Sequence, residues 1–188
     1  ECPGLFDQED SGEQFAAEFG SLGHIYLPPA GIQGRTPAEI QYAAEAWSNL
    51  ELLGFSAGIC PRCAGVIEQS VSVCENHDGS EAVCEQCGRR YAALFEVECG
   101  ACQYASSGIP IICLLAETEL LSFVTDHGAN PLLPDTHDVA QGALADYDEE
   151  VRSVEPVEVA LSFRIRDEML TLVVDESGSV VDATRERG

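Results

Sequence analysis

Four pairs of metal-ligating residues, each with two intervening residues, constrain the fold of this chain more than any other feature of its sequence. A turn of this length lets both side chains of a pair face one ion, at about 2.3 Å for a thiolate. Eight such ligands fill two tetrahedral sites, so the sequence predicts two structural Zn²⁺ ions. The pairs are Cys60 and Cys63, Cys74 and His77, Cys84 and Cys87, and Cys99 and Cys102.

A disulfide framework is the competing interpretation of these cysteines. We disfavour it because a reducing cytoplasm keeps thiols free, and because two cysteines so close in sequence form only a strained bridge. Four protein ligands leave no coordination position for water, so the predicted sites hold structure and do not activate a nucleophile. The sequence also has no phosphate loop, nucleophile elbow or HExxH motif. We therefore predict that the chain is not an enzyme.

The spacing leaves open whether the four pairs combine in a nested, a sequential or a crossed arrangement. We favour nesting because only six residues, 78–83, separate the two middle pairs. These pairs would close a local site and bring the first and last pairs together beneath it. His77 is the weakest of the eight predicted ligands, because residues 75–78 also have the composition of a solvated polar loop.

The net charge of the chain restricts its partners. The 188 residues include 33 acidic side chains, and all nine basic residues are arginines, which gives a formal charge of −24. Such a surface does not hold nucleic acid or an anionic membrane unaided, because that binding needs clustered basic side chains. Its self-repulsion is screened at molar salt, where the Debye length is about 3 Å. The composition therefore predicts the cytoplasm of a halophile.

No stretch of the sequence predicts a membrane span. The longest apolar run, Ile109–Ala116, is far shorter than the roughly 18 residues that a spanning helix needs. The chain begins at Glu1 and not at methionine, so we expect it to be part of a longer protein.

The most regular local pattern predicts a helix over residues 37–53. A capping box at Thr36 and Glu39 marks its start, and Gly54 marks its end. Its apolar residues recur at spacings of three and four, which predicts one stripe facing the core and including Trp47.

Other patterns complete the predicted secondary structure. Residues 66–73 and 91–97 favour strands, Ile109–Leu115 predicts a buried strand, and Glu117–His127 predicts a helix stopped by Gly128. The remaining predictions are a hairpin within residues 1–30, a short helix at Asp135–Leu144, and strands at Val151–Val154, Val157–Ile165, Leu170–Val174 and Val180–Ala183.

These elements predict an α+β fold in three regions. Residues 1–57 form an N-terminal hairpin and a linking helix, residues 58–105 a two-zinc ribbon module, and residues 106–188 an α+β domain with antiparallel strands. The fold class is therefore zinc-ribbon β-hairpins with a few helices and a small C-terminal antiparallel β-meander.

Several other chemically active residues have structural interpretations. His127 ends the predicted helix, where an imidazole is favourable beside the negative end of the helix dipole. Cys113 lies in an apolar run and predicts a buried, inert thiol. The acidic run at residues 146–150 predicts a solvated face. Three arginines beside the cysteine pairs are too few for a nucleic-acid patch: Arg62, Arg89 and Arg90.

A series of short motifs gives the chain a family resemblance. In order they are Leu27-Pro28-Pro29-Ala30-Gly31, Arg35-Thr36-Pro37-Ala38-Glu39, Cys60-Pro61-Arg62-Cys63, Cys84-Glu85-Gln86-Cys87-Gly88-Arg89-Arg90 and Thr125-Asp126-His127-Gly128. The chain resembles the C-terminal region of haloarchaeal ArsR-type winged-helix transcription regulators. The resemblance implies zinc-ribbon modules, a linking helix and a small β-rich end, with the winged-helix domain preceding Glu1.

The resemblance also bears on the cysteines. Such regulators carry a first CxxC ribbon where this chain has only Cys2, so that ribbon looks eroded and Cys2 is not expected to bind metal. Shorter relatives have two CxxC pairs, the second followed by a tyrosine and an apolar strand, as Cys102 is followed by Tyr104 here. This supports nesting, with residues 74–87 as an insertion.

We therefore expect a non-catalytic zinc-binding region that serves regulation or assembly in a haloarchaeal transcription regulator. It would form a homodimer or contact a protein partner, and would reach DNA only through a domain absent from this chain. The alternative is a metal or redox sensor, or effector-binding domain, in which the zinc site containing His77 is labile.

Overall fold

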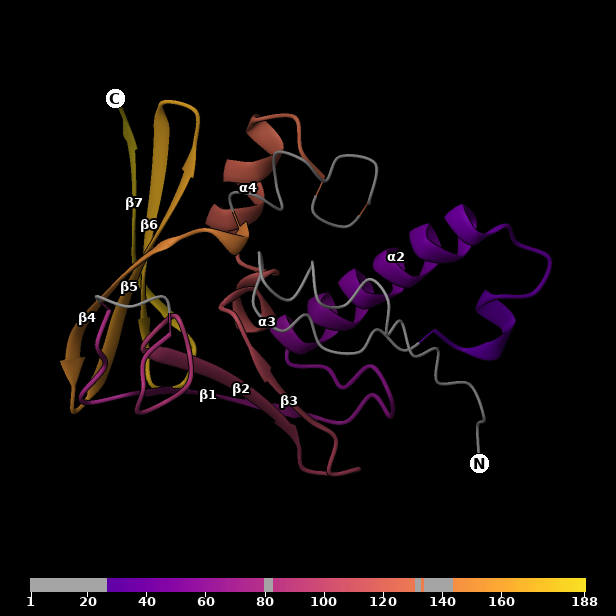
Figure 1. Ribbon diagram of the computed structural model, residues 1–188, viewed down its shortest axis with the longest axis horizontal. Helices are drawn as coiled ribbons and strands as arrows, with labels where there is room; N and C mark the ends of the chain where they lie inside the picture. The colour runs from indigo at the N-terminus through magenta and orange to yellow at the C-terminus, as the bar shows by residue number, and fades with distance from the viewer. Residues whose placement is uncertain (1–26, 80–82, 131–132, 134–143) are drawn as a thin grey trace.

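The computed structural model describes residues 27–79, 83–130, 133 and 144–188, which form an α+β fold with two antiparallel sheets. In Figure 1 a three-stranded sheet lies below two short helices, a four-stranded sheet stands on one side, and a long helix extends to the other. The predicted fold class, with its C-terminal antiparallel meander, is confirmed.

The long helix α2 (Pro37–Ser56) begins as its sequence predicts. The Thr36 backbone N–H donates to the Glu39 carboxylate at 2.8 Å, and the Thr36 hydroxyl accepts from the Glu39 N–H at 3.5 Å, which completes the capping box. The predicted end at Gly54 is wrong, because the helix continues to Ser56 and the left-handed residue is Gly58, with φ of 73°. A short 3-10 helix, η1 (Pro29–Gly31), precedes α2.

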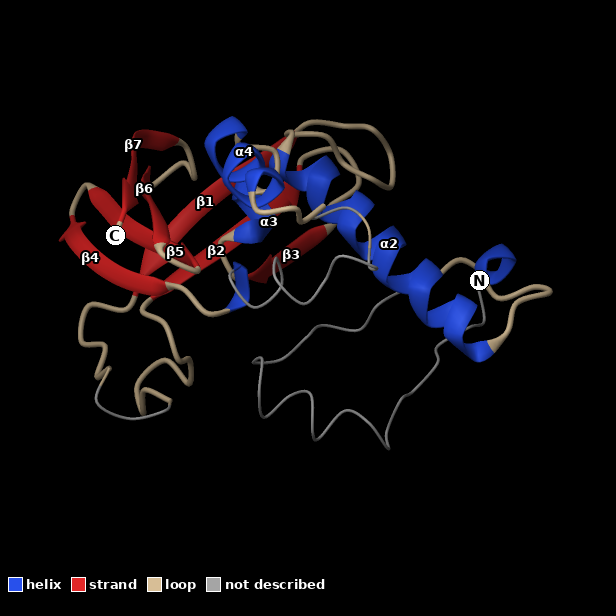
Figure 2. Ribbon diagram, turned by 90° about the horizontal axis from the view of Figure 1, so that it is seen from above, coloured by secondary structure: helices blue, strands red, loops and turns tan. Residues whose placement is uncertain are grey.

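None of the apolar stripe predicted to face the core from α2 is fully buried: four of its residues are half-buried and two are exposed. Trp47 is 38% exposed and Leu50 is 53% exposed, whereas Phe55 is the buried residue of the helix. Phe55 lies five positions from Leu50, about 140° around the helix, so the body of the protein covers a different face. The C-terminal half of α2 packs on α3, and the N-terminal half of α2 extends beyond the sheets, as Figures 1 and 2 show.

The three-stranded sheet is built around a fully paired antiparallel ladder. β1 and β2 pair along their whole length, from Ile67 opposite Cys99 to Val73 opposite Ala93. Apart from Gln69 and Leu94, apolar side chains lie on the buried face and polar ones on the other face, as expected for a sheet covered on one side. The third strand, β3, begins at Ala105, the last residue of the predicted ribbon module, and continues into the predicted C-terminal domain. The strands are β1 (Ile67–Val73), β2 (Ala93–Cys99) and β3 (Ala105–Gly108).

The buried strand predicted at Ile109–Leu115 is wrong. This segment forms a short helix, α3 (Ile111–Leu114), whose residues Ile112, Cys113 and Leu114 are buried. Pro110 precedes it with φ of −53° and ψ of −30°, which already has helical geometry. A short run that is apolar on every side carries no periodicity, so a buried helix and a buried strand look alike in sequence.

The C-terminal part follows its predicted pattern closely. α4 (Thr118–Asp126) has His127 as its C-cap, and Gly128 has φ of 80°. The four-stranded sheet has the order β4-β5-β6-β7, and three of its strands extend beyond their predicted limits. The helix predicted at Asp135–Leu144 and the hairpin predicted within residues 1–30 lie almost wholly outside the described residues. The strands are β4 (Asp148–Val154), β5 (Val157–Ile165), β6 (Glu168–Asp175) and β7 (Val180–Arg187).

One hydrophobic core joins these parts. It includes Phe55 of α2, Phe95 of β2, Phe123 of α4 and Phe163 of β5. The two sheets also meet through the backbone, where the Val71 N–H donates to the Glu176 carbonyl at 2.9 Å. The predicted regions therefore share a core in the described part of the chain.

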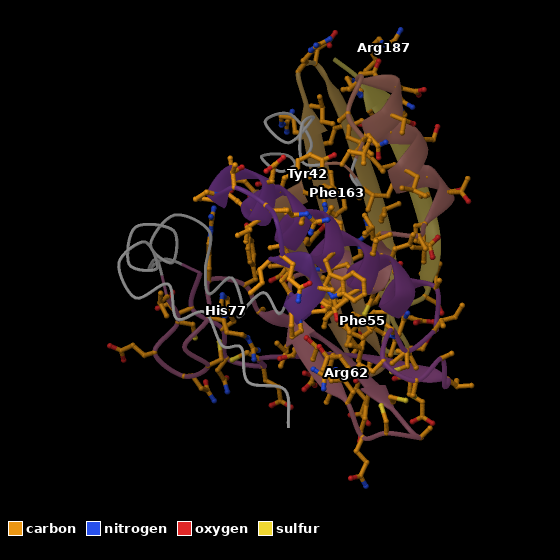
Figure 3. All side chains as sticks on the ribbon, turned by 90° about the vertical axis from the view of Figure 1, so that its right-hand side faces the viewer. Tyr42, Phe55, Arg62, His77, Phe163 and Arg187 are labelled. Atoms are coloured by element: carbon orange, nitrogen blue, oxygen red, sulfur yellow. The ribbon has the colours of Figure 1, made fainter. Side chains whose placement is uncertain are left out.

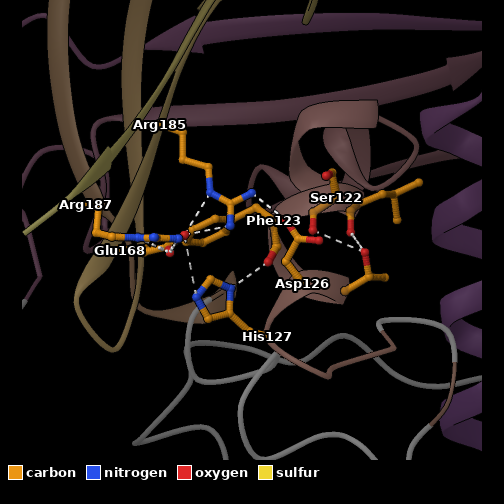
Figure 4. Close-up of polar contacts among 9 residues, drawn as sticks. Ser122, Phe123, Asp126, His127, Glu168, Arg185 and Arg187 are labelled. Atoms are coloured by element: carbon orange, nitrogen blue, oxygen red, sulfur yellow. Dashed lines mark hydrogen bonds and ion pairs between the residues drawn. The ribbon is translucent and has the colours of Figure 1, made fainter.

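An ion-pair network fixes α4 against the last two strands (Figure 4). Glu168, whose side chain is 9% exposed, accepts hydrogen bonds from Arg185 at 2.6 and 2.9 Å, and from Arg187. Arg185 also donates to Asp126 of α4 at 2.6 Å, and Nε2 of His127 lies 3.9 Å from Glu168. The hydrogen bonds from Arg185 and Arg187 hold the pKa of Glu168 below its ordinary value of 4.5.

The substitution Glu168→Gln should lower the melting temperature near neutral pH, because glutamine cannot accept charge-assisted bonds from both arginines. A lowered pKa stabilises the folded state only while the carboxylate is ionised, so the deficit should shrink as the pH falls below 4.5. Circular dichroism melts of both proteins across this pH range, at constant KCl, measure the difference. Glu186→Gln, on the exposed face of β7, is the control. A deficit that does not change with pH would contradict this assignment.

Candidate metal centres

The eight predicted ligands lie in two groups of four, in the nested arrangement. Within each group the ligand atoms all lie within 4.8 Å of one another. We call Cys60, Cys63, Cys99 and Cys102 the outer site, and Cys74, His77, Cys84 and Cys87 the inner site. Each group can hold one metal ion.

The two sites lie at opposite ends of the β1–β2 ladder. The outer site is formed where β1 begins and β2 ends, and the inner site where β1 ends and β2 begins. The loop that carries the inner site projects beside β4 in Figures 1 and 2. In Figure 3 His77 of the inner site lies apart from Arg62, which stands between two ligands of the outer site in the sequence.

Three of the four ligand pairs share one backbone turn. The residue four positions after the first cysteine has positive φ, and its N–H donates to the carbonyl of that cysteine at 2.8–3.0 Å. The N–H of the first cysteine in turn donates to the carbonyl five positions later, at 2.8–3.0 Å. The left-handed residues are Ala64 (φ 58°), Gly88 (φ 66°) and Gln103 (φ 58°).

This conformation is costly for Ala64 and Gln103, because a left-handed residue with a Cβ loses about 1–2 kcal/mol. Such residues persist where surrounding interactions hold them, which is common at ligand sites. Gly65 is favoured for a different reason. A Cβ at Gly65 would lie 3.2 Å from Sγ of both Cys63 and Cys99, so glycine lets the chain pass this close to the outer site without displacing a ligand.

The fourth pair, Cys74 and His77, has a different turn. The His77 N–H donates to the Cys74 carbonyl at 3.3 Å, and the Cys74 N–H donates to Ala92, across the site, at 3.0 Å. Nε2 of His77 lies 3.1 Å from the Arg90 carbonyl. A carbonyl only accepts, so Nε2 carries the proton and donates, which leaves the lone pair of Nδ1 for a metal. Nδ1 faces Sγ of Cys87 at 3.5 Å.

The separations between ligand atoms fit a bound ion and not a disulfide. Sγ of Cys60 lies 3.7 Å from that of Cys102, and Sγ of Cys63 lies 3.5 Å from that of Cys99. A disulfide needs about 2.05 Å, whereas the edge of a tetrahedron with ligands at about 2.3 Å is about 3.8 Å. Every cysteine in the described part of the chain is a free thiol.

Backbone N–H groups favour the thiolate at one cysteine of each site. Those of Cys102 and Ala101 lower the pKa of Cys99 to about 6, and those of Asp78 and Cys87 lower the pKa of Cys84 to about 6. Both cysteines are buried. Because these two pKa values lie below 7, each site contains a thiol that is largely ionised at neutral pH. This favours metal binding, because a metal ligand must be deprotonated.

In the acidic run at residues 146–150, Asp146, Asp148 and Glu150 are exposed, as the sequence predicts, whereas Glu149 is half-buried. The Glu149 carboxylate accepts the N–H of Ala92 at 2.7 Å and that of Ala93 at 3.1 Å. Asp146 pairs with Arg90 at 2.8 Å. These partners are more than 50 residues apart in the chain, so no local pattern could have revealed them.

A family model described as "Domain of unknown function (DUF7351)" matches residues 17–180. The chain belongs to this family. The DUF7351 match includes both ligand groups and most of the four-stranded sheet. No curated protein and no solved structure matches the chain.

The arginines near the candidate metal centres of this DUF7351 chain have intramolecular partners. The Arg62 guanidinium lies 3.8 Å from the centre of the Tyr104 ring, and Arg89 donates to the Ala92 carbonyl at 3.0 Å. Arg90 binds Asp146.

None of the helices in the described residues combines the length and apolarity that crossing a membrane requires.

Single substitutions should separate the two sites. Cys99→Ser should reduce the metal content by one ion per chain through loss of the outer site, and Cys84→Ser should do so through the inner site. Cys113→Ala should keep both ions, because Cys113 is buried in α3, where burial raises its pKa to about 12. Elemental analysis of each purified variant measures the content. Equal content in all three variants would contradict the assignment.

Proposed function

We propose that this chain is a non-catalytic, zinc-binding region that serves assembly in a haloarchaeal transcription regulator. The observation that carries the proposal is the pair of four-ligand groups at the two ends of one β ladder. Each group supplies all four ligands of a tetrahedral ion, and the thiolate-rich donor set suits Zn²⁺. With no position left for water, such ions hold the ladder together and do not activate a substrate.

The regulator context rests on the sequence resemblance and on the charge of the chain. The resemblance implies a winged-helix domain before this region, and we assign contact with DNA to that domain. The net charge of −24 supports the same division, because this region repels phosphate. The acidic, lysine-free composition supports a halophilic cytoplasm, where molar salt screens the repulsion.

The outer site supports the C-terminal end of α2. The Ile59 N–H donates to the Gly54 carbonyl at 2.8 Å, and the ring of Tyr104, which follows Cys102, stacks on Phe55 with centroids 5.5 Å apart. A Cβ at Gly54 would lie 3.0 Å from the Ile59 carbonyl, so glycine permits this close approach. Zinc at the outer site would therefore fix the direction in which α2 leaves the body.

α2 supplies the surface for assembly. The proposed partner at this surface is α2 of a second copy of the chain. A groove of about 790 Å³ along its outer face is lined largely by apolar residues, including Tyr42, Trp47 and Leu50. Two chains of charge −24 repel wherever acidic faces meet, which favours contact through this groove. In an antiparallel pair of α2 helices, a two-fold axis could pass at Ala43. Arg35 lies eight positions before Ala43 and Glu51 lies eight positions after it, so Arg35 would stand level with Glu51 of the partner. Such a contact is self-complementary.

A second candidate function is a metal or redox sensor. The different turn at Cys74 and His77, and the projection of the inner-site loop beside β4, favour release of the inner ion before the outer one. A scaffold would instead keep both ions over the same range of chelator.

A stepwise chelator titration in about 2 M KCl tests these functions together. The released zinc, the far-ultraviolet circular dichroism and the mass by light scattering are followed in the same samples. The assembly function predicts a dimer that dissociates as the outer ion is lost, with loss of structure in the ladder. Early release of the inner ion from an intact dimer would support the sensor. A folded dimer after removal of both ions would contradict the proposal.

A further inference from the structure

A short segment connects the inner site to the C-terminal sheet. We call residues 89–92 the linking segment; it runs from the last turn of the inner site to the start of β2. Its carbonyl groups face the site. The Arg89 carbonyl accepts the N–H of Cys84 at 3.0 Å, the Arg90 carbonyl accepts Nε2–H of His77 at 3.1 Å, and the Ala92 carbonyl accepts the N–H of Cys74 at 3.0 Å.

Other groups of the same segment face the residues around the start of β4. The two oxygens of Glu149 accept the N–H groups of Ala92 and Ala93, at 2.7 and 3.1 Å. Arg90 binds Asp146 at 2.8 Å, and the Tyr91 ring stacks on Tyr147 with centroids 4.1 Å apart. The segment is thus held between the inner ligands and residues 146–149.

One peptide group shows how directly the two sides are connected. The peptide between Ala92 and Ala93 accepts the Cys74 N–H at its carbonyl and donates its own N–H to Glu149. A peptide group is planar and rigid, and in the trans form its carbonyl and N–H point in opposite directions. The carboxylate that orients the N–H therefore also orients the carbonyl that holds the ligand residue.

We propose that Glu149 is a positioning residue of the inner metal centre and that ion binding there is coupled to the docking of residues 146–149. The inference rests on the proposed function only in requiring that the inner site binds zinc. Coupling of this kind is reciprocal: if Glu149 strengthens zinc binding, then zinc strengthens the contact of Glu149 with the linking segment. Loss of a group that hydrogen-bonds a ligand typically weakens metal binding by about 10–100-fold, and Glu149 acts one step further out, so a loss at the lower end of this range is expected.

The substitution Glu149→Gln tests the proposal in the full chain. Glutamine keeps the shape of the side chain, but one of its two terminal groups donates and cannot accept the N–H of Ala92 or Ala93. Zinc affinity at both sites is measured by competition with a chromophoric chelator in high KCl, and Co²⁺ spectra distinguish a site with four thiolates from one with three thiolates and an imidazole. Inner-site affinity should fall by about tenfold or more, and outer-site affinity should not change.

Glu150→Gln is the matched control. Glu150 is the next residue on β4, its side chain is 75% exposed, and it lies 3.8 Å from Arg152. This variant changes the net charge equally but should leave both affinities unchanged. Equal inner-site affinities in the Glu149 and Glu150 variants would overturn the proposal.

Amide hydrogen exchange of the unsubstituted protein provides a second test that does not depend on the folding of a variant. Removal of the inner ion alone should speed exchange at Ala92 and Ala93 and in β4, while the amides of β6 stay protected. Unchanged exchange at Ala92 and Ala93 would overturn the coupling. If the unsubstituted chain binds no ion at the inner site, the proposed function fails and the inference fails with it. If the inner site of the Glu149→Gln variant binds the ion as tightly as that of the unsubstituted protein, only the inference fails.

Discussion

The arrangement of four ligands at each end of the β1–β2 ladder is the constraint on which the rest of the structure depends. The ladder is short, from Ile67 opposite Cys99 to Val73 opposite Ala93, and only one of its faces is buried. An isolated two-stranded ladder of this length is marginal in water, and here the third strand, the helix α3 and the shared core support it. A structural zinc ion contributes about 10–16 kcal/mol in zinc-finger peptides, so ions at the two ends would add substantially to this support. One ion at each end would fix both the register and the ends of the ladder.

The two ends of the ladder also hold different parts of the protein. At the outer end, the close approach of Ile59 to Gly54 and the stacking of Tyr104 on Phe55 connect the site to α2. At the inner end, the linking segment connects the site to Glu149 and Tyr147. The helix and the C-terminal sheet are thereby attached to a common support. Changes at either ligand group would therefore affect elements of the fold far from that group.

The sequence predicted the elements whose signals are local. The ligand spacing indicated the eight ligands and favoured their nesting, the capping box located the start of α2, and strict alternation identified β5 with its limits. The exposed face of α2 could not be predicted, because periodicity shows that a helix has an apolar stripe but not that the body of the protein covers it. The helix at Ile111–Leu114 was missed because a run buried on all sides has no periodicity. Glu149 and Gly65 were missed because their roles depend on partners that only the fold brings near.

X-ray absorption at the zinc edge tests the central claim most directly, because it reports the ligands of every bound zinc ion in the protein as purified. Four thiolates at the outer site, and three with one imidazole at the inner site, predict about 3.5 sulfur and 0.5 nitrogen neighbours per zinc on average. The distances should be about 2.3 Å to sulfur and about 2.0 Å to nitrogen. A shell dominated by oxygen, or a pure protein without zinc, would contradict the account.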